Sequence, residues 1–258
     1  MSADILHAGL GWPVAAALLA VSFASSFITV AFGIGGGAVM LAVLAILLPA
    51  PAIIPVHGVV QLGSSVGRAA VMSRRHLYLP VVAPFGIGAL IGVALGGTFV
   101  VQLDPATLQI GVGCFILWSI LATPPAFMRR SAGVAGGFSS FLTMFFGGTG
   151  PFVAAFVKTQ GLDRMGFVAT HATLMTLQHL LKTFTFAILG FAFAEWAGMI
   201  ALLILFGFLG TLAGRQVLTR IDEKRFRFAL NAILAVLALR LIYAGGADYL
   251  GYWRGNKG

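Results

Sequence analysis

Acidic side chains are scarce in this sequence of 258 residues, which has 7 Asp and Glu against 16 Lys and Arg and a formal net charge of +9. Charged residues of both signs make up 9% of the chain, whereas 59% is hydrophobic and the mean hydropathy is +1.01. A water-soluble domain with so little charge could not cover its surface with polar groups. The composition therefore excludes a soluble domain and indicates an integral protein of a lipid bilayer.

Cysteine is equally rare, because Cys114 is the only one and it lies in an apolar segment. A single cysteine can form neither an intramolecular disulfide nor a CxxC site. The zinc-protease motif HExxH is missing, and so is a pair of aspartates within the apolar segments. The sequence therefore predicts a protein that is not an enzyme and that has no resident metal or cofactor.

Long apolar segments are the most abundant feature of the chain. About 20 apolar residues cross the hydrocarbon core of a bilayer as a helix, and six segments approach that length without interruption. They are residues 53–72, 77–101, 107–127, 164–187, 191–214 and 226–243. Two further apolar regions, residues 12–49 and 131–160, each contain a cluster of glycines. The predicted fold class is an all-α polytopic membrane protein.

Lysine and arginine gather in short connectors at residues 73–76, 128–130 and 215–227. Basic connectors face the cytoplasm, and lipid headgroups rather than nucleic acid are their expected partners. The connectors at residues 102–105 and 189–190 have no Lys or Arg and are predicted to face outward. Each glycine-broken region is therefore predicted to enter and leave the membrane on one side, as a hairpin, although residues 12–32 are long enough to be a full crossing.

The whole arrangement occurs twice, at an interval of about 114 residues. Residues 1–127 and 128–258 each contain a broken hairpin followed by three spans. Because a hairpin and three spans have odd parity, the two repeats are predicted to be inverted relative to each other. Inverted repeats with broken helices are typical of secondary transporters, which bind their substrate between the repeats.

The glycine clusters read FGIGGG at residues 32–37 and FGGTGP at residues 146–151. Clustered glycines free several backbone amides, which hydrocarbon tolerates only where they line a cavity or are covered by protein. Pro151 suits the first position of a restarting helix, and helix amino termini attract anions. The alternative is that the glycines only allow close helix packing. The predicted substrate-binding residues of the clusters are Gly35, Gly36, Gly37, Gly148, Thr149 and Gly150.

A polar stripe follows each cluster. In the first repeat four polar residues at intervals of four, three and four share one helical face, and the second repeat has a similar face at corresponding positions. Ionisable groups within spans are costly, so two equivalent stripes indicate a polar interior, although Arg68 and Lys182 could instead extend to the interface. The predicted substrate-binding residues of the stripes are His57, Gln61, Ser64, Ser65, Arg68, His171, Thr173, Gln178, His179 and Lys182.

The chemistry of this interior favours a small anion, because it combines histidine, arginine, lysine and amides with almost no carboxylate. Histidine is the only evident titrating group there, so protonation of a histidine would couple anion binding to pH. A soft-metal permease with His57, His171, His179 and methionines as ligands is an alternative, which the neighbouring cations disfavour. A membrane-embedded assembly subunit is another.

The glycine clusters and the duplicated halves resemble the sulfite exporter TauE/SafE family of membrane transporters. The resemblance is carried by FGIGGG at residues 32–37, SRRH at 73–76, FGGTGP at 146–151 and ATHATLMTLQHLLK at 169–182. It implies transport of a small sulfur-containing anion, such as sulfite, sulfoacetate or another organosulfonate. It also implies a location in the bacterial cytoplasmic membrane.

Overall fold

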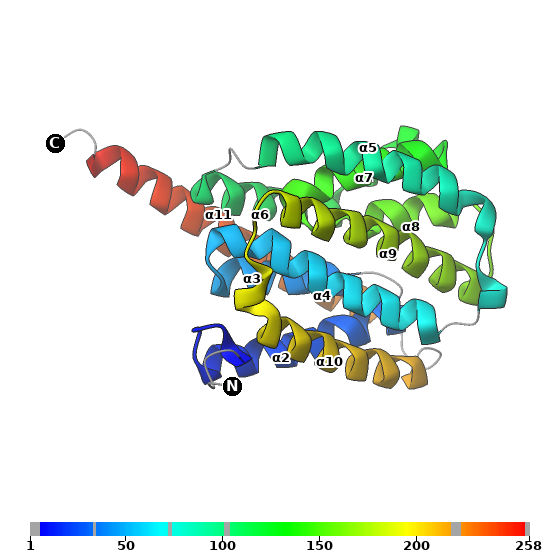
Figure 1. The fold of residues 1–258 in the computed structure, drawn as a ribbon, viewed down its shortest axis with the longest axis horizontal. Helices are drawn as coiled ribbons and strands as arrows, with labels where there is room; N and C mark the ends of the chain where they lie inside the picture. The colour runs from blue at the N-terminus through cyan, green and yellow to red at the C-terminus, as the bar shows by residue number, and fades with distance from the viewer. Residues whose placement is uncertain (1–5, 33–34, 72–73, 101–103, 218–222, 256–258) are drawn as a thin grey trace.

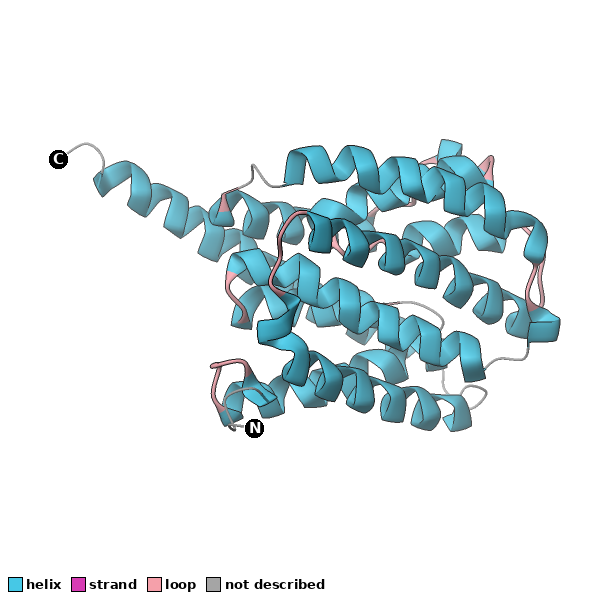
Figure 2. Cartoon of the chain, viewed as in Figure 1, coloured by secondary structure: helices cyan, strands magenta, loops and turns pink. Residues whose placement is uncertain are grey.

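The computed structural model describes residues 6–32, 35–71, 74–100, 104–217 and 223–255, and the regular structure within them is entirely helical (Figure 2). The α-helices are α2 (Trp12–Phe32), α3 (Gly36–Leu47), α4 (Ala50–Val71), α5 (Val82–Val100), α6 (Pro105–Leu121), α7 (Ala132–Phe146), α8 (Gly150–Lys158), α9 (Arg164–Ile188), α10 (Phe193–Val217) and α11 (Glu223–Gly255). Short 3-10 turns form η1 (Arg74–His76), η2 (Leu79–Val81) and η3 (Ala126–Arg129). The predicted all-α class is confirmed.

Each of the six uninterrupted apolar segments corresponds to one helix. Four helices are long and apolar enough to span a membrane: Trp12–Phe32, Leu79–Val100, Phe193–Gln216 and Phe228–Tyr249. The helices α4 and α9, with 22 and 25 residues, also have the length, but they carry the polar stripes. These features describe a polytopic membrane protein.

The helix α6 is shorter than the segment 107–127 predicted from hydropathy. It ends at Leu121, and the next residue, Ala122, is extended with ψ 151°. Pro124 and Pro125 follow closely. Proline cannot continue a helix and biases the residue before it toward extended backbone, so the helix stops although the sequence remains apolar.

The two broken regions form antiparallel hairpins, α2 with α3 and α7 with α8 (Figure 1). The helices α7 and α8 have 15 and 9 residues, which correspond to about 22 and about 14 Å, so neither crosses a bilayer alone. In the first hairpin α3 is also short, with 12 residues, but α2 has 21 and is long enough to cross. The hairpins therefore share a broken tip and differ in the length of one arm.

The open ends of the hairpins lie at opposite ends of the molecule. The end of α3 leads into the start of α4, and Ala50 there shares a pocket with Val100 and Leu189 at the ends of α5 and α9. At the other end the start of α7 packs on the start of α5, where a Cβ atom at Gly133 would lie 3.5 Å from the carbonyl oxygen of Pro84. This opposite placement is the geometry expected of inverted repeats.

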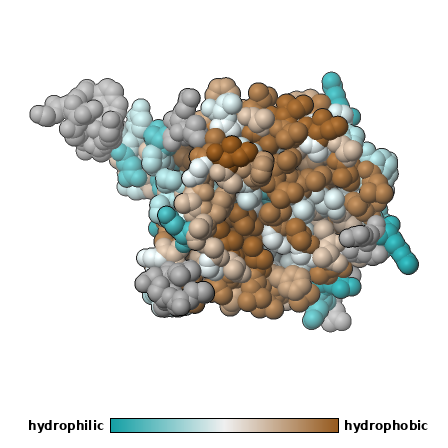
Figure 3. All heavy atoms as spheres, in the orientation of Figure 1, coloured by the Kyte–Doolittle hydropathy of each residue, from teal (hydrophilic) through white to brown (hydrophobic). Residues whose placement is uncertain are grey.

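Positive charge gathers at the end of the molecule where α4 and α10 finish and where α7 and α9 begin, which we call the basic end (Figure 1). The opposite end, with Pro49, Asp104 and residues 189–192, is called the neutral end. On the face that Figure 3 shows, hydrophobic residues cover most of the surface between the two ends. The exposed cations at the basic end are Arg75, Arg129, Arg130, Lys158, Arg164 and Arg215. This distribution fits a bilayer around the middle of the molecule. That the basic end faces the cytoplasm stays a prediction.

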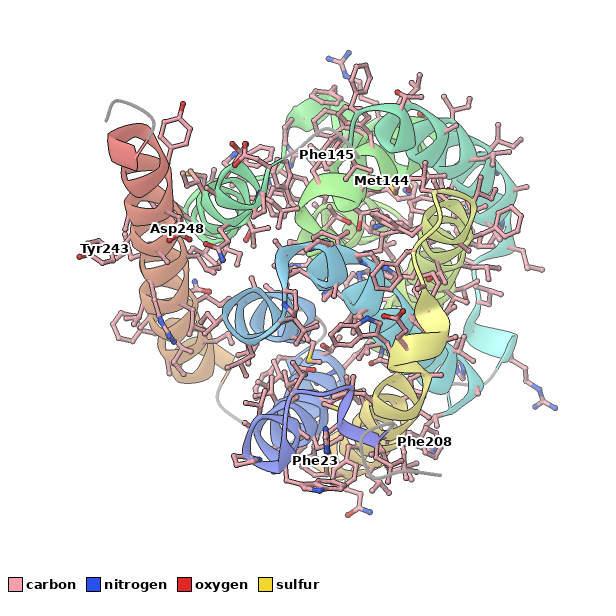
Figure 4. All side chains as sticks on the ribbon, turned by 60° about the vertical axis from the view of Figure 1, so that its left-hand side comes forward. Phe23, Met144, Phe145, Phe208, Tyr243 and Asp248 are labelled. Atoms are coloured by element: carbon pink, nitrogen blue, oxygen red, sulfur yellow. The ribbon has the colours of Figure 1, made fainter. Side chains whose placement is uncertain are left out.

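Small residues let the outer helices pack so closely that their backbones are in contact. A Cβ atom at Gly88 or Gly92 on α5 would lie 2.0 or 2.1 Å from a carbonyl oxygen of α7, and one at Gly210 on α10 would lie 2.1 Å from the carbonyl oxygen of Phe23 on α2. Figure 4 shows Phe23 and Phe208 on these two neighbouring helices. Such close contacts are typical of helix packing in membranes. They hold α5, α7, α2 and α10 around the central pair α4 and α9.

Candidate functional site

The centre of the molecule contains a small cavity of about 30 Å³. The antiparallel helices α4 and α9 meet the two hairpin tips there (Figure 1). The lining residues are Thr29, Gly35, Gly37, Ala38, His57, Gln61, Arg68, Gly147, Gly148, Gly150, Pro151, His171, Met175 and His179. Both glycine clusters and both polar stripes therefore contribute to one cavity.

Each hairpin tip turns on a glycine in the left-handed region of backbone space. Gly35 has φ 106° and Gly147 has φ 71°, conformations that residues with a Cβ atom rarely adopt. Directly after these turns α3 restarts at Gly36 and α8 restarts at Gly150, with Pro151 in its first turn. The amino termini of two short helices thus lie at the cavity, where their unpaired amides and dipoles favour negative charge.

A histidine braces each restarting helix. His57 Nε2 lies 3.0 Å from the carbonyl oxygen of Gly37, and His171 Nε2 lies 3.1 Å from the carbonyl oxygen of Gly150. A carbonyl oxygen can only accept, so each Nε2 donates its hydrogen. The two repeats therefore use equivalent histidines to fix equivalent helix starts beside the cavity.

Gln178 fixes the second hairpin tip from the side. Its Nε2 donates to Thr149 Oγ1 over 2.5 Å, and its Oε1 accepts from Ser139 Oγ over 3.0 Å. Gln178, Thr149 and Ser139 are fully buried. These bonds join α9 to α7 and to the tip, so Gln178 and Thr149 position the cavity wall without lining it.

Other predicted residues also lie behind the cavity wall. Ser64 Oγ lies 3.0 Å from Ser26 Oγ and links α4 to α2, and Thr173 donates to the carbonyl oxygen of Ala169 in its own helix. Gly36 packs against α2, because a Cβ atom there would lie 1.7 Å from the carbonyl oxygen of Ser25. The lining includes none of these three residues.

The two buried cations have few partners. Arg68 is 3% exposed and donates from Nη2 to Ser65 Oγ over 2.9 Å, while its Nε has no hydrogen-bond partner. Lys182 is fully buried and its Nζ has no hydrogen-bond partner. The carboxylates whose side chains the structure describes, Asp104, Asp163, Glu195 and Asp248, are all exposed. Positive charge at the centre is therefore not neutralised by acidic groups in the described part of the chain.

Sequence reasoning missed Thr29, Ala38, Gly147, Pro151 and Met175 as lining residues. A signal for Thr29 was present, because Ser22, Ser25, Ser26 and Thr29 recur at helical spacing and form a buried polar stripe on α2. Met175 occupies the stripe position of α9 between His171 and His179. Of the other three, Gly147 ends α7, and Ala38 and Pro151 lie in the first turns of α3 and α8.

The family model of the sulfite exporter TauE/SafE family matches residues 18–241, which include both hairpins and the central helices. The chain belongs to this family. Comparisons with curated proteins and with solved structures gave no match. TauE/SafE proteins form a family of membrane transporters for sulfur anions such as sulfite. The cavity of this TauE/SafE protein lies where its two hairpin tips meet.

The described residues of this TauE/SafE protein form neither a metal centre nor a hydrolase nucleophile elbow. Within the described residues no group of three His, Cys, Asp or Glu side chains could hold a metal ion. Gly63, Ser65 and Gly67 match the spacing GxSxG of many hydrolases, but they lie inside α4 rather than at a strand-to-helix turn. Ser65 there accepts the hydrogen bond from Arg68, so this spacing does not form a nucleophile elbow.

Proposed function

We propose that the chain transports a small sulfur-containing anion, such as sulfite, sulfoacetate or another organosulfonate, through the central cavity between its two inverted repeats. The observation that carries the proposal is the joining of two helix amino termini, three histidines and Arg68 in one buried cavity whose lining has no carboxylate. Membership in the TauE/SafE family supports the same substrate class.

Electrostatics favour an anion over a cation in this cavity. A buried unit charge of either sign interacts strongly with nearby charges because the surroundings polarise little. Arg68 and the amino termini of α3 and α8 attract negative charge, and a cation would meet only repulsion from them. A sulfur oxyanion supplies several acceptor oxygens, which match the donors present.

The size of the cavity suits a compact group. A water molecule needs about 10 to 15 Å³ of such space, so a cavity of about 30 Å³ holds a group of only a few heavy atoms. The SO₃ group is common to sulfite and to organosulfonates. We therefore propose that the cavity receives this group.

Histidine gives the site a means of coupling anion binding to protons. Because His57 donates from Nε2 to Gly37, its neutral ring leaves Nδ1 as an acceptor. This Nδ1 is buried without a hydrogen-bond partner, as is Nδ1 of His179. A second proton on His57 would convert Nδ1 into a donor for the anion, so binding of anion and proton would support each other.

Thermal stability of the purified protein tests the substrate class, since a ligand that binds the native state raises stability by about 2.7 kcal/mol at 100 times its Kd. Sulfite, sulfoacetate, taurine, phosphate and a divalent metal would be compared. We expect sulfite or sulfoacetate to raise the melting temperature most, Arg68→Gln to remove the increase, and the exposed control Arg129→Gln to keep it. Stabilisation by the metal alone, or by sulfur anions equally in Arg68→Gln, would contradict the proposal.

A further inference from the structure

We infer that Lys182 forms an anion-binding station of its own on the neutral-end side of the central cavity, whereas Arg68 lines the cavity itself. This inference rests on the proposed function, because it assigns steps of the same anion path to individual residues.

The two cations are equivalent in the repeats. Arg68 follows His57 by 11 residues, and Lys182 follows His171 by 11 residues. Eleven residues are about three helical turns, so each cation lies on the same face of its helix as the bracing histidine. Equivalent positions in inverted repeats lie at opposite depths, which places one cation toward each end.

In the structure, the cation of each repeat lies close to the central helix of the other repeat. The ammonium of Lys182 lies beside α4, where a Cβ atom at Gly58 would be 3.6 Å from Nζ. Lys182 thus interacts electrostatically with His57, the histidine of the other repeat, and Arg68 with His171, while both cations interact with His179. Gly58 and Arg68 are ten residues apart on α4, which corresponds to roughly 15 Å along the helix. The ammonium of Lys182 and the backbone of Arg68 therefore lie at different depths along α4.

A second pocket lies beyond Lys182 at the neutral end. It has a volume of about 340 Å³, and its lining includes Ile54 on α4, Leu108 on α6 and Phe186 on α9. On α9, His179 lines the central cavity and Phe186 lines this neutral-end pocket. Lys182 lies between them at spacings of three and four residues, on the same helical face. An anion that passes between the two pockets along this face must pass Lys182.

The state of Lys182 fits a station rather than a structural ion pair. Burying an unpaired ammonium is unfavourable even after relaxation of the protein, and Nζ of Lys182 has no hydrogen-bond partner to offset this cost. A passing anion supplies the missing counter-charge. Two stations with one cation each also hold the anion less tightly than a single site with both, and conduction requires that an ion can leave each site.

The experiment uses the full chain with Cys114→Ser and a single cysteine introduced by Ile54→Cys in the neutral-end pocket. The rate of reaction with an anionic sulfonate-bearing thiol reagent is divided by the rate with a neutral thiol reagent. Ile54 is one helical turn from Gly58, where the ammonium of Lys182 lies, so the charge should raise this ratio by at least about tenfold. We expect Lys182→Gln to abolish the increase and Arg68→Gln to preserve it.

A ratio that is unchanged in Lys182→Gln, or that falls equally in Arg68→Gln, would overturn the inference. Gly58→Ala keeps the charge of Lys182 but moves its side chain, because the new Cβ atom would lie 2.8 Å from Lys182 Cε. The ratio of the two reaction rates should therefore fall in this variant too. A ratio equal to that of the parent protein would count against the assigned position of Lys182. This readout needs no transport and no sulfur-anion substrate. Failure of the proposed function would show instead in the thermal-stability comparison.

Discussion

Neighbouring glycines at the first hairpin tip should respond in opposite ways to the same substitution. Gly36 faces α2, where a Cβ atom would lie 1.7 Å from the carbonyl oxygen of Ser25, whereas a Cβ atom at Gly37 would have Gln61 Oε1 as its nearest neighbour, at 3.5 Å. The first distance is impossible without movement and the second is an ordinary van der Waals contact. Gly36→Ala should therefore disturb packing, and Gly37→Ala should add a methyl group to the cavity.

The expected magnitudes follow from these contacts. Real Cβ atoms essentially never approach another heavy atom within 3.0 Å, so Gly36→Ala must move α3 away from α2 by more than about 1 Å, and overpacking of this kind costs about 1 to 3 kcal/mol. The same movement weakens the bond between His57 and the Gly37 carbonyl, which adds about 1 kcal/mol. We expect Gly36→Ala to lower the free energy of unfolding by about 2 to 4 kcal/mol. Gly37→Ala should change it by less than about 1 kcal/mol, because alanine is also the better helix former.

Chemical unfolding in detergent measures the stability of both variants, and equilibrium binding of sulfite and sulfoacetate measures their sites. Gly37→Ala should remain folded and monodisperse but should lose at least about tenfold in anion affinity, equivalent to about 1.4 kcal/mol, because a methyl group occupies much of a cavity of about 30 Å³. Wild-type stability of Gly36→Ala would show that Gly36 does not pack against α2, and wild-type affinity of Gly37→Ala would show that Gly37 does not line the anion site.

Three further predictions concern other parts of the molecule. Gln178→Leu should lower the free energy of unfolding by about 2 to 3 kcal/mol, since it breaks hydrogen bonds to α7 and to the hairpin tip. The control Thr176→Val, which loses one hydrogen bond within α9, should lower it by less than about 1 kcal/mol. Equal losses in chemical unfolding would show that Gln178 does not hold the hairpin tip to α7. Anion affinity, measured by equilibrium binding between about pH 5.5 and about pH 8.5, should weaken as pH rises and His179→Gln should flatten the dependence; a flat wild-type profile would remove histidine from the mechanism. Hydrogen bonds from the Thr107 hydroxyl and amide lower the pKa of Asp104. The Asp104 carboxylate therefore stabilises the fold at pH values above the ordinary pKa of aspartate, and this stabilisation is lost as pH falls through the lowered pKa. The stability of wild type should then fall more steeply with decreasing pH than that of Asp104→Asn, and parallel curves of acid unfolding would contradict this.

Hydropathy and residue spacing were sufficient to predict the helices and the breaks. All six apolar segments became helices, and the glycine clusters became tips because only glycine easily adopts the φ values of Gly35 and Gly147. Spacing also placed His57 and His171 on faces that meet one cavity. These features depend on local sequence, which a single chain reveals directly.

Contacts between helices could not be predicted from the sequence. Helical spacing groups Gln178 with His171 but does not reveal that Gln178 bonds to Thr149 and Ser139 behind the wall. It likewise could not show that Gly36 touches Ser25 while Gly37 faces the cavity. The partner of each face is decided by how separate helices dock, and the small residues that permit close docking occur throughout the chain.

We propose above that one cavity, where the two hairpin tips meet, binds a small sulfur anion. Equilibrium binding of radiolabelled sulfite and sulfoacetate to the purified protein, before and after Gly148→Ala, tests it most directly. A Cβ atom at Gly148 would lie 3.4 Å from Leu41 Cδ2, so the variant should fold with only a slight adjustment of that side chain while the methyl group narrows the cavity. We expect saturable binding of at least one of the two anions by wild type and clearly weaker binding by a folded Gly148→Ala. Absence of saturable binding of either anion, or equal affinity in a folded Gly148→Ala, would contradict it.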